Sequence, residues 1–153
     1  ETAMALSLHP NIRGIKDSSG NVAKMAEIVA GAREGFRVLA GSAGFLLPAL
    51  VVGAVGAVAA LANIAPRECL RLQALYDEGK LEEARALQAR LVAPNNAVTT
   101  GFGVAGLKAA LQFVAHYGGH PRRPLAPLDE GERVRLRAIL AEADLLRGLR
   151  PAG

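Results

Sequence analysis

Residues 11–21, NIRGIKDSSGN, are the stretch of this chain that decides its fold. Residues 11–17 follow a His-Pro pair as a short apolar run, which predicts a buried strand. The run ends at Lys16, and Ser18 and Asn21 follow closely with side-chain oxygens that can cap the start of a helix. The stretch therefore predicts a strand that passes directly into a helix, with a lysine at the junction.

Beyond this stretch, predicted strands and helices continue to alternate. The expected elements are a helix through residues 25–29, a strand at 36–41, a short helix at 45–52, a strand at 56–63 and a long helix from Pro66 that is interrupted at 77–79. Short loops and uninterrupted apolar strands in the order βαβαβα predict a parallel sheet with crossover helices. After Asn95 only helices are expected, one over residues 104–117 and one that Asp129 or a neighbour caps and that continues to Leu146.

Three parallel strands cannot close a barrel, because an eight-stranded barrel takes about 250 residues. An open sheet of three strands leaves unpaired edges that something must cover. At 153 residues, with 51% hydrophobic and 21% charged, the chain can form one folded core. The pattern fits either a small doubly wound domain with a helical tail or a part of something larger.

Composition argues against several classes of function. The basic residues behind the net charge of +4 are scattered, and aromatic residues make up only 4%, so no nucleic-acid-binding surface is expected. The uncharged stretch 38–66 is long enough to cross a membrane, but Pro48 and four glycines interrupt it, and a buried α/β segment is expected instead. The single cysteine, Cys69, is expected to be a small buried hydrophobe, and it allows a reducing compartment, the cytoplasm or in a eukaryote the mitochondrion.

Lys16 is the residue with the strongest case for chemistry. The last residue of a buried parallel strand points toward the carboxyl edge of the sheet, where the active sites of α/β proteins gather. Burial favours the neutral amine, which can attack a ketone and form a Schiff base that withdraws electrons from a neighbouring carbon. The alternative is a strand-end lysine that reaches solvent or pairs with Asp17.

Three segments together resemble the pyruvate-dependent class I aldolases, that is, the dihydrodipicolinate synthase / N-acetylneuraminate lyase family of (β/α)8 barrels. They are NIRGIKDSSGN (11–21), VLAGSAGFLLPALVVGAVGAVAALANIAP (38–66) and LEEARALQARLVAPNNAVT (81–99). The resemblance covers nearly the whole chain in the same order. LAGSAGF (39–45), where many dihydrodipicolinate synthases carry Gly-Asp-Asp, and GLKAALQFVAHYGG (106–119) resemble the 4-hydroxy-2-oxoglutarate aldolase branch.

The resemblance implies a fold and a nucleophile. Residues 1–94 would form the C-terminal half of a TIM (β/α)8 barrel, an α/β fold whose sixth, seventh and eighth strands are the three predicted here. Residues 95–153 would form the appended C-terminal helical bundle. The sequence GIKDSSG resembles the family's Schiff-base signature, so Lys16 would form the iminium with pyruvate.

The resemblance also implies four substrate-binding residues. Ser18 would lie near the site, although an ordinary helix cap explains it equally well. Gly41 and Ser42 would bring backbone and a small side chain close to the bound keto acid, and a tight turn that needs glycine is their alternative. Val58 matches a position that lines the pocket through its backbone, but core packing alone explains a valine there.

Some parts of the family's site are missing from this chain. The proton-relaying tyrosine and the Gly-Thr-Thr-Gly-type loop for the pyruvate carboxylate belong to the first five strands of the family's barrel, and Tyr76 and Tyr117 match neither. His9, His116 and His120 have no metal-ligand spacing, so neither a metal nor a cofactor is expected. Whether this chain alone buries the lysine stays open.

The expected function is that of a Schiff-base aldolase, for example the reversible cleavage of 4-hydroxy-2-oxoglutarate to pyruvate and glyoxylate. The alternatives are the condensation of pyruvate with aspartate semialdehyde, a catalytically inactive half-barrel with a structural or oligomerising role, and an unrelated small α/β binding domain. The expected partners are a pyruvate-type 2-oxo acid and either a complementary N-terminal half-barrel or further copies of this chain. No nucleic acid and no membrane is expected.

Overall fold

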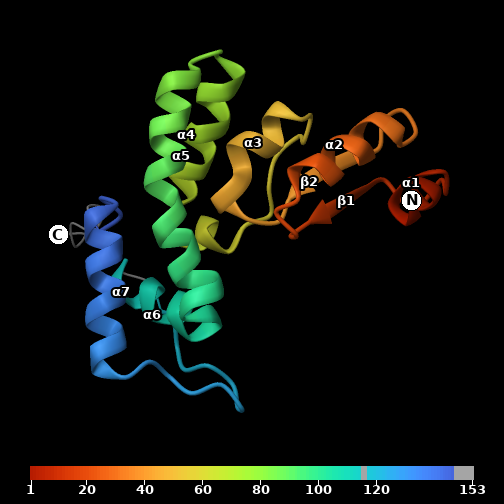
Figure 1. The fold of residues 1–153 in the computed structure, drawn as a ribbon. Coiled ribbons are helices and arrows are strands. Elements are labelled where there is room, and N and C mark those ends of the chain that lie inside the picture. The colour runs from red at the N-terminus through yellow and green to blue at the C-terminus, as the bar shows by residue number, and fades with distance from the viewer. Residues whose placement is uncertain (115–116, 147–153) are drawn as a thin grey trace.

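The computed structural model describes residues 1–114 and 117–146 (Figure 1). The described α-helices are α1 (Thr2–Ser7), α2 (Val22–Gly31), α3 (Leu46–Val51), α4 (Pro66–Asp77), α5 (Leu81–Asn96), α6 (Gly103–Phe113) and α7 (Glu130–Glu142). The strands are β1 (Gly14–Asp17) and β2 (Arg37–Ala40). Two 3-10 turns, η1 (Ala43–Phe45) and η2 (Ala60–Asn63), and one π-helical turn, η3 (Ala97–Gly101), connect the helices.

β1 and β2 form a parallel sheet in which Lys16 pairs with Leu39. The predicted third strand, residues 56–63, is corrected to a much shorter element, because only one bridge, between Ala40 and Ala57, joins it to β2. Within the described part of the chain no strand lies on its other side, so the ladder stops and the chain turns into η2. The sheet is thus a two-stranded one with a bridged third segment.

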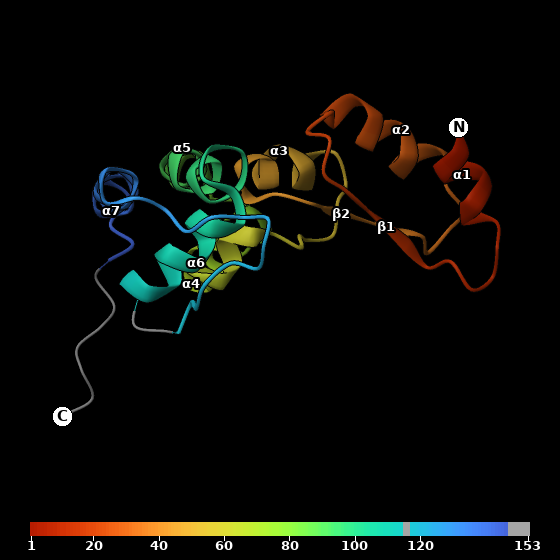
Figure 2. The ribbon, with the colours of Figure 1, turned by 90° about the horizontal axis from the view of Figure 1, so that it is seen from below.

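Helices cover one face of this sheet. α2 and α3 both contact β2, and Figure 2 shows them on the same side of the strands. Side chains alternate between the two faces of a strand, and Val38 and Ala40, which face the helices, are buried. On the other face Lys16 is exposed and Val58 is 56% exposed. The sheet is therefore buried on one side only.

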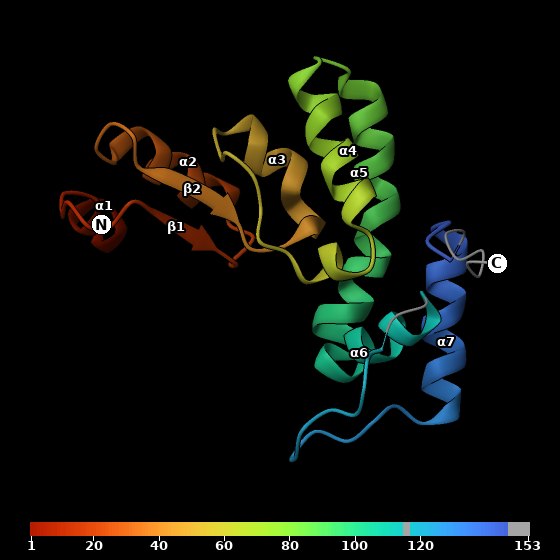
Figure 3. The ribbon, with the colours of Figure 1, turned by 180° about the vertical axis from the view of Figure 1, so that it is seen from behind.

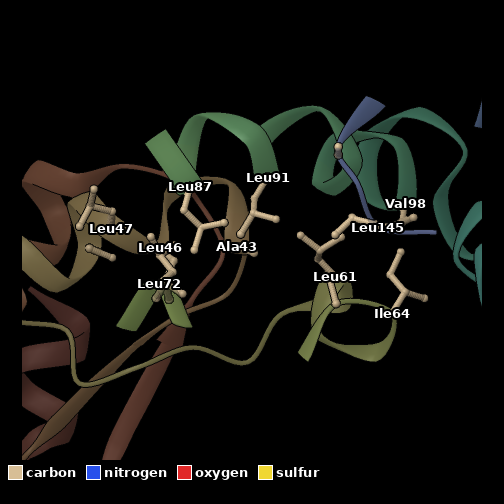
Figure 4. Packing of buried hydrophobic residues seen from close by; sticks show 14 of the residues in the cluster. Ala43, Leu46, Leu47, Leu61, Ile64, Leu72, Leu87, Leu91, Val98 and Leu145 are labelled. Carbon is tan, nitrogen blue, oxygen red and sulfur yellow. The ribbon is translucent and has the colours of Figure 1, made fainter. Parts of the chain in front are cut away.

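The hydrophobic core extends from the helical side of the sheet through α4 and α5 to α7 as one cluster (Figure 4). Leu46, Leu72 and Leu87 meet near the sheet, and Leu61 and Leu145 lie toward the C-terminal helices. The stretch 38–66 forms β2, η1, α3 and η2, as expected of an α/β segment. No helix in the described ranges is long and apolar enough to cross a membrane.

Local signals located most of the helix ends. Gly79 adopts a left-handed conformation, φ +72°, at the predicted break between α4 and α5. Asp129 caps α7 through a reciprocal capping box with Glu132, but α7 ends at Glu142 rather than at Leu146. The left-handed backbone of the nearby Asp144, φ 59°, is incompatible with a continuing helix.

Two other predictions concern the C-terminal part. α6 ends at Phe113, before the expected residue 117, and residues 115–116, including His116, lie outside the described residues. The expected boundary between residues 94 and 95 falls inside α5, and the division into two domains stays a prediction.

Candidate active site

A pocket of about 410 Å³ lies at the carboxyl ends of β1 and β2. Figure 3 shows both strands pointing toward the region where α5 passes the sheet. Three segments line the pocket, namely the residues after β1, the residues after β2 and the junction of α5 with η3. The lining includes Ser18, Gly41, Ser42, Asn95, Thr99 and Thr100.

The loops after the two strands pack directly against each other. A Cβ atom on Gly41 would overlap the Ser18 hydroxyl and would lie 2.8 Å from the Ser18 Cα atom, so only glycine fits this approach. The Gly41 N–H donates to the Asp17 carbonyl at 2.7 Å. The Ser42 hydroxyl accepts from the Gly44 N–H at 3.2 Å and donates to Asn95 Oδ1 at 3.0 Å. Three of the predicted substrate-binding residues thus meet around one pocket.

Ser18 is not the cap of the helix that follows it. The N-cap of α2 is Asn21, whose Oδ1 accepts from the Lys24 N–H at 2.9 Å. Ser18 lines the pocket instead, and its hydroxyl lies against Gly41. The helix-cap explanation for this serine is therefore excluded.

Lys16 and Val58 do not line this pocket. Whether this chain alone buries Lys16 was open from the sequence, and the structure shows that the side chain is exposed on the uncovered face of the sheet. Of the two forms of the alternative, the structure agrees with a lysine that reaches solvent and not with a pair, because Lys16 forms no ion pair within residues 1–114 and 117–146 and Asp17 pairs with Lys24 instead. The Val58 N–H donates to the Ala40 carbonyl at 2.9 Å, and its side chain points away from the core.

Asp17 anchors the loop that carries the serines. Its side chain is buried, Oδ2 accepts from Lys24 Nζ at 2.7 Å, and Oδ1 accepts from the Ser19 N–H at 2.7 Å and from the Ser19 hydroxyl. Burial raises the pKa of the Asp17 carboxyl, but the hydrogen bonds from Lys24 and Ser19 and the charge of Lys24 outweigh burial and hold that pKa below its usual 3.8. Asp17 is therefore ionised at neutral pH beside the pocket.

The sequence did not predict that α5 and η3 form one wall of the pocket. Gln88 is buried, its Nε2 donates to the Ala43 carbonyl at 2.9 Å, and its Oε1 accepts from the Leu47 N–H at 2.8 Å. Asn95, about two turns further along the same face of α5, accepts a hydrogen bond from the Ser42 hydroxyl. A polar Gln among leucines and the run PNNAVTT were the available signals, but neither reveals which loop it contacts.

Cys69 occupies a separate place in the fold. It is half-buried on α4 rather than fully buried, and it lines an apolar pocket of about 260 Å³ together with Leu46 and Pro66. Burial, and to a smaller degree the charge of Glu68, raises the pKa of the thiol to about 11. The thiol is therefore protonated at neutral pH and behaves as an apolar side chain.

Curated proteins with similar sequences are lyases. The dihydrodipicolinate synthetase family profile matches residues 1–143. The probable mitochondrial 4-hydroxy-2-oxoglutarate aldolase of Emericella nidulans is 40% identical over 140 residues, which cover 92% of this chain and 45% of that protein. A 4-hydroxy-tetrahydrodipicolinate synthase of Geobacter sp. is 34% identical over 146 residues, covering 95% of this chain and 50% of the synthase.

The solved structures that resemble this chain belong to the same family as these relatives. Dihydrodipicolinate synthase from Bacillus anthracis superimposes with a TM-score of 0.87 at 32% identity, over 98% of this chain and 49% of that one. A prophage protein of the dihydrodipicolinic acid synthase family from E. coli K12, solved in complex with pyruvate, gives a TM-score of 0.84 at 28% identity, over 94% and 50%. The chain thus spans about half the length of the proteins it matches, and its short parallel sheet with helices is consistent with part of a TIM barrel. On this evidence the chain belongs to the dihydrodipicolinate synthetase family.

Proposed function

We propose that this chain carries the Schiff-base lysine of a class I aldolase that acts on 2-oxo acids, with Lys16 as the nucleophile. The observation that carries the proposal is the position of Lys16 in β1, two residues before the polar pocket at the carboxyl edge of the sheet. The likeness to a protein solved with pyruvate and to a probable 4-hydroxy-2-oxoglutarate aldolase supports pyruvate as the common product.

The reaction we propose follows from the chemistry of a neutral amine. Nζ of Lys16 adds to the C2 keto carbon, a C–N bond forms, and the keto oxygen leaves as water to give an iminium. Removal of the proton from the C4 hydroxyl then breaks the C3–C4 bond, and the electron pair moves into the iminium to form an enamine. The aldehyde departs, C3 is protonated, and water hydrolyses the iminium to release pyruvate and restore Lys16.

In this proposal the neighbouring loops hold the keto acid. Ser18 and Ser42 contribute hydroxyls, Gly41 allows the close approach of the two loops, and Val58 contributes backbone on the uncovered face. Their proximity at one edge of the sheet supports this assignment for Ser18, Gly41 and Ser42.

The proposal requires a cover over the exposed face of the sheet. An amine in water is mostly ammonium at neutral pH, and only desolvation or a nearby cation favours the neutral form. Lys16 is exposed, Val55 is 43% exposed and Val58 is 56% exposed. Because the relatives are about twice as long as this chain, we propose that a complementary N-terminal half-barrel covers this face and supplies the proton relay.

Trapping the iminium tests the proposal directly. The full-length protein, meaning this chain together with the proposed N-terminal half-barrel, is incubated with pyruvate and borohydride, and the adduct is mapped by mass spectrometry. We expect one pyruvyl adduct on Lys16, lost in Lys16→Arg and retained in the control Lys80→Arg, whose lysine pairs with Glu78 on the surface. A folded protein without an adduct would refute the aldolase and favour the structural half-barrel, which the open sheet edges allow.

The second substrate distinguishes the two family reactions. The higher identity to the aldolase, 40% against 34% for the synthase, supports cleavage of 4-hydroxy-2-oxoglutarate over condensation with aspartate semialdehyde. We expect pyruvate consumption by the full-length protein with glyoxylate as acceptor. Consumption with aspartate semialdehyde alone would assign the chain to the synthases.

A further inference from the structure

We propose that Asn95, Thr99 and Thr100 form a subsite for the oxygen-bearing end of the aldehyde substrate. The inference rests on the proposed function of Lys16 and names the part of the chain that selects the second substrate. All three residues come from the junction of α5 and η3 and line the pocket opposite the strand-end loops.

The pocket lies within reach of a substrate bound to Lys16. Ser18, which lines it, follows Lys16 by two residues, so their Cα atoms are at most about 7 Å apart. A substrate of several carbons attached to Nζ can therefore extend past Ser18 toward the η3 wall. With a volume of about 410 Å³, the pocket has room for a small aldehyde fragment.

The π-helical turn places two hydroxyls on this wall. π-helical turns are rare and occur frequently at functional sites, because the wider turn shifts side chains out of the regular helical register. The Thr99 hydroxyl donates to the Asn95 carbonyl at 2.7 Å, which fixes its orientation. The Thr100 hydroxyl is 3.5 Å from the Asn96 carbonyl, a weak bond that a ligand can replace.

The Asn95 side chain is held against the loop that follows β2. It is buried, and its Oδ1 accepts from the Ser42 hydroxyl at 3.0 Å. A Cβ on Gly44 would lie 2.8 Å from Nδ2, so the amide packs directly on that glycine. Among the described residues Nδ2 has one partner, Asn96 Oδ1 at 3.5 Å, which leaves donor capacity at the pocket.

The chemistry of the lining determines the ligand class. None of the described residues that line the pocket is charged, and seven of them carry a hydroxyl or an amide. Such a site recognises oxygen atoms by hydrogen bonds, and a methyl group in their place leaves its polar groups unpaired. The ligand is thus an aldehyde whose carbonyl carbon carries a carboxylate or a hydroxymethyl group.

Substrate competition tests this subsite in the full-length protein. Aldol addition of pyruvate is measured with glyoxylate, glycolaldehyde and propanal, the last having a methyl in place of the hydroxyl of glycolaldehyde. For Thr100→Val and Thr99→Val we expect kcat/KM for the oxygen-bearing aldehydes to fall relative to propanal by about tenfold for each lost hydrogen bond. A larger loss with glyoxylate identifies a carboxylate, and a larger loss with glycolaldehyde identifies a hydroxyl.

Two controls separate this inference from the proposed function. Thr2→Val makes the same substitution on the exposed start of α1. It should leave the ratio of kcat/KM for the oxygen-bearing aldehydes to kcat/KM for propanal unchanged. Each variant is also trapped with pyruvate and borohydride. An unchanged ratio in variants that still form the Lys16 adduct would overturn the subsite alone, whereas no adduct in the unmodified protein would overturn the aldolase and the subsite together.

Discussion

At the scale of the residue, Asp17 is the charge on which the site's first loop depends. It accepts from Lys24 Nζ and from two groups of Ser19 while its own side chain is buried. For Asp17→Asn we expect the free energy of unfolding at pH 7 to fall by about 1–3 kcal/mol, because hydrogen bonds to a charged group are lost and Lys24 is left unpaired. Denaturant unfolding measures the change, with the exposed Asp77→Asn as the matched control.

The ion pair between Asp17 and Lys24 predicts that the free energy of unfolding depends on pH. The pKa of Asp17 in the folded protein is below its usual 3.8, so the carboxyl stabilises the fold fully above the unfolded pKa. The contribution is lost as the pH falls through the lower folded pKa. We therefore expect the stability difference between the protein and Asp17→Asn to be full at pH 7 and to shrink steadily below pH of about 4. A difference that persists unchanged into strong acid would contradict this account.

At the scale of the element, α5 acts as the rigid support of the loop after β2. Gln88 and Asn95 are seven residues apart, about two helical turns, and so project from the same face of the helix. Gln88 holds η1 and the start of α3 through the Ala43 carbonyl and the Leu47 N–H, and Asn95 holds Ser42. One helix thus fixes both ends of the loop that borders the pocket.

Gln88→Leu tests this support. The substitution keeps the size of the side chain but leaves buried backbone groups without partners, which costs about 1–3 kcal/mol for each group. We expect a lower free energy of unfolding in denaturant and faster amide exchange at Leu47, whose N–H donates to Gln88. Gln112→Leu, on the exposed side of α6, is the control. Equal stability of the two variants would show that α5 supports the loop by apolar packing alone.

At the scale of the whole molecule, the uncovered face of the sheet is the dominant feature. The core is one cluster on the helical side, whereas Lys16, Val55 and Val58 are exposed on or beside the bare strands. Unpaired parallel strands with apolar side chains recruit further chain, whether from another half-barrel or from another copy. A complementary half would therefore stabilise the fold as well as complete the site.

Light scattering, which measures the native mass, tests whether the uncovered face of the sheet recruits further chain. We expect residues 1–153, when studied alone, to self-associate, and Val58→Lys to reduce the association because it puts a charge on the open face. Val134→Lys, at an exposed position of α7 on the far side of the core, should have little effect. A monodisperse monomer would count against both a missing half-barrel and a strand-paired oligomer.

The helix boundaries show how much of the fold could be predicted locally. The cap at Asn21, the break at Gly79 and the cap at Asp129 depend on the conformation of the residues themselves and on neighbours a few positions away. The third strand could not be predicted in this way. Residues 56–63 have a strand-like composition, but a strand forms only where neighbouring strands pair with it. In the described part of the chain, this segment has a neighbour on one side only, β2.

The candidate site also has some features that nearby residues determine and others that depend on distant parts of the chain. By itself the sequence determined the strand that carries Lys16, the helix after it, the glycine at position 41 and, through its motifs, the family. Only the tertiary structure decided that Lys16 is exposed and that Asn95 closes the pocket. The physical reason is that caps and turns are satisfied within a few residues, whereas burial and the partners of Ser42 depend on groups as far as 53 positions along the chain.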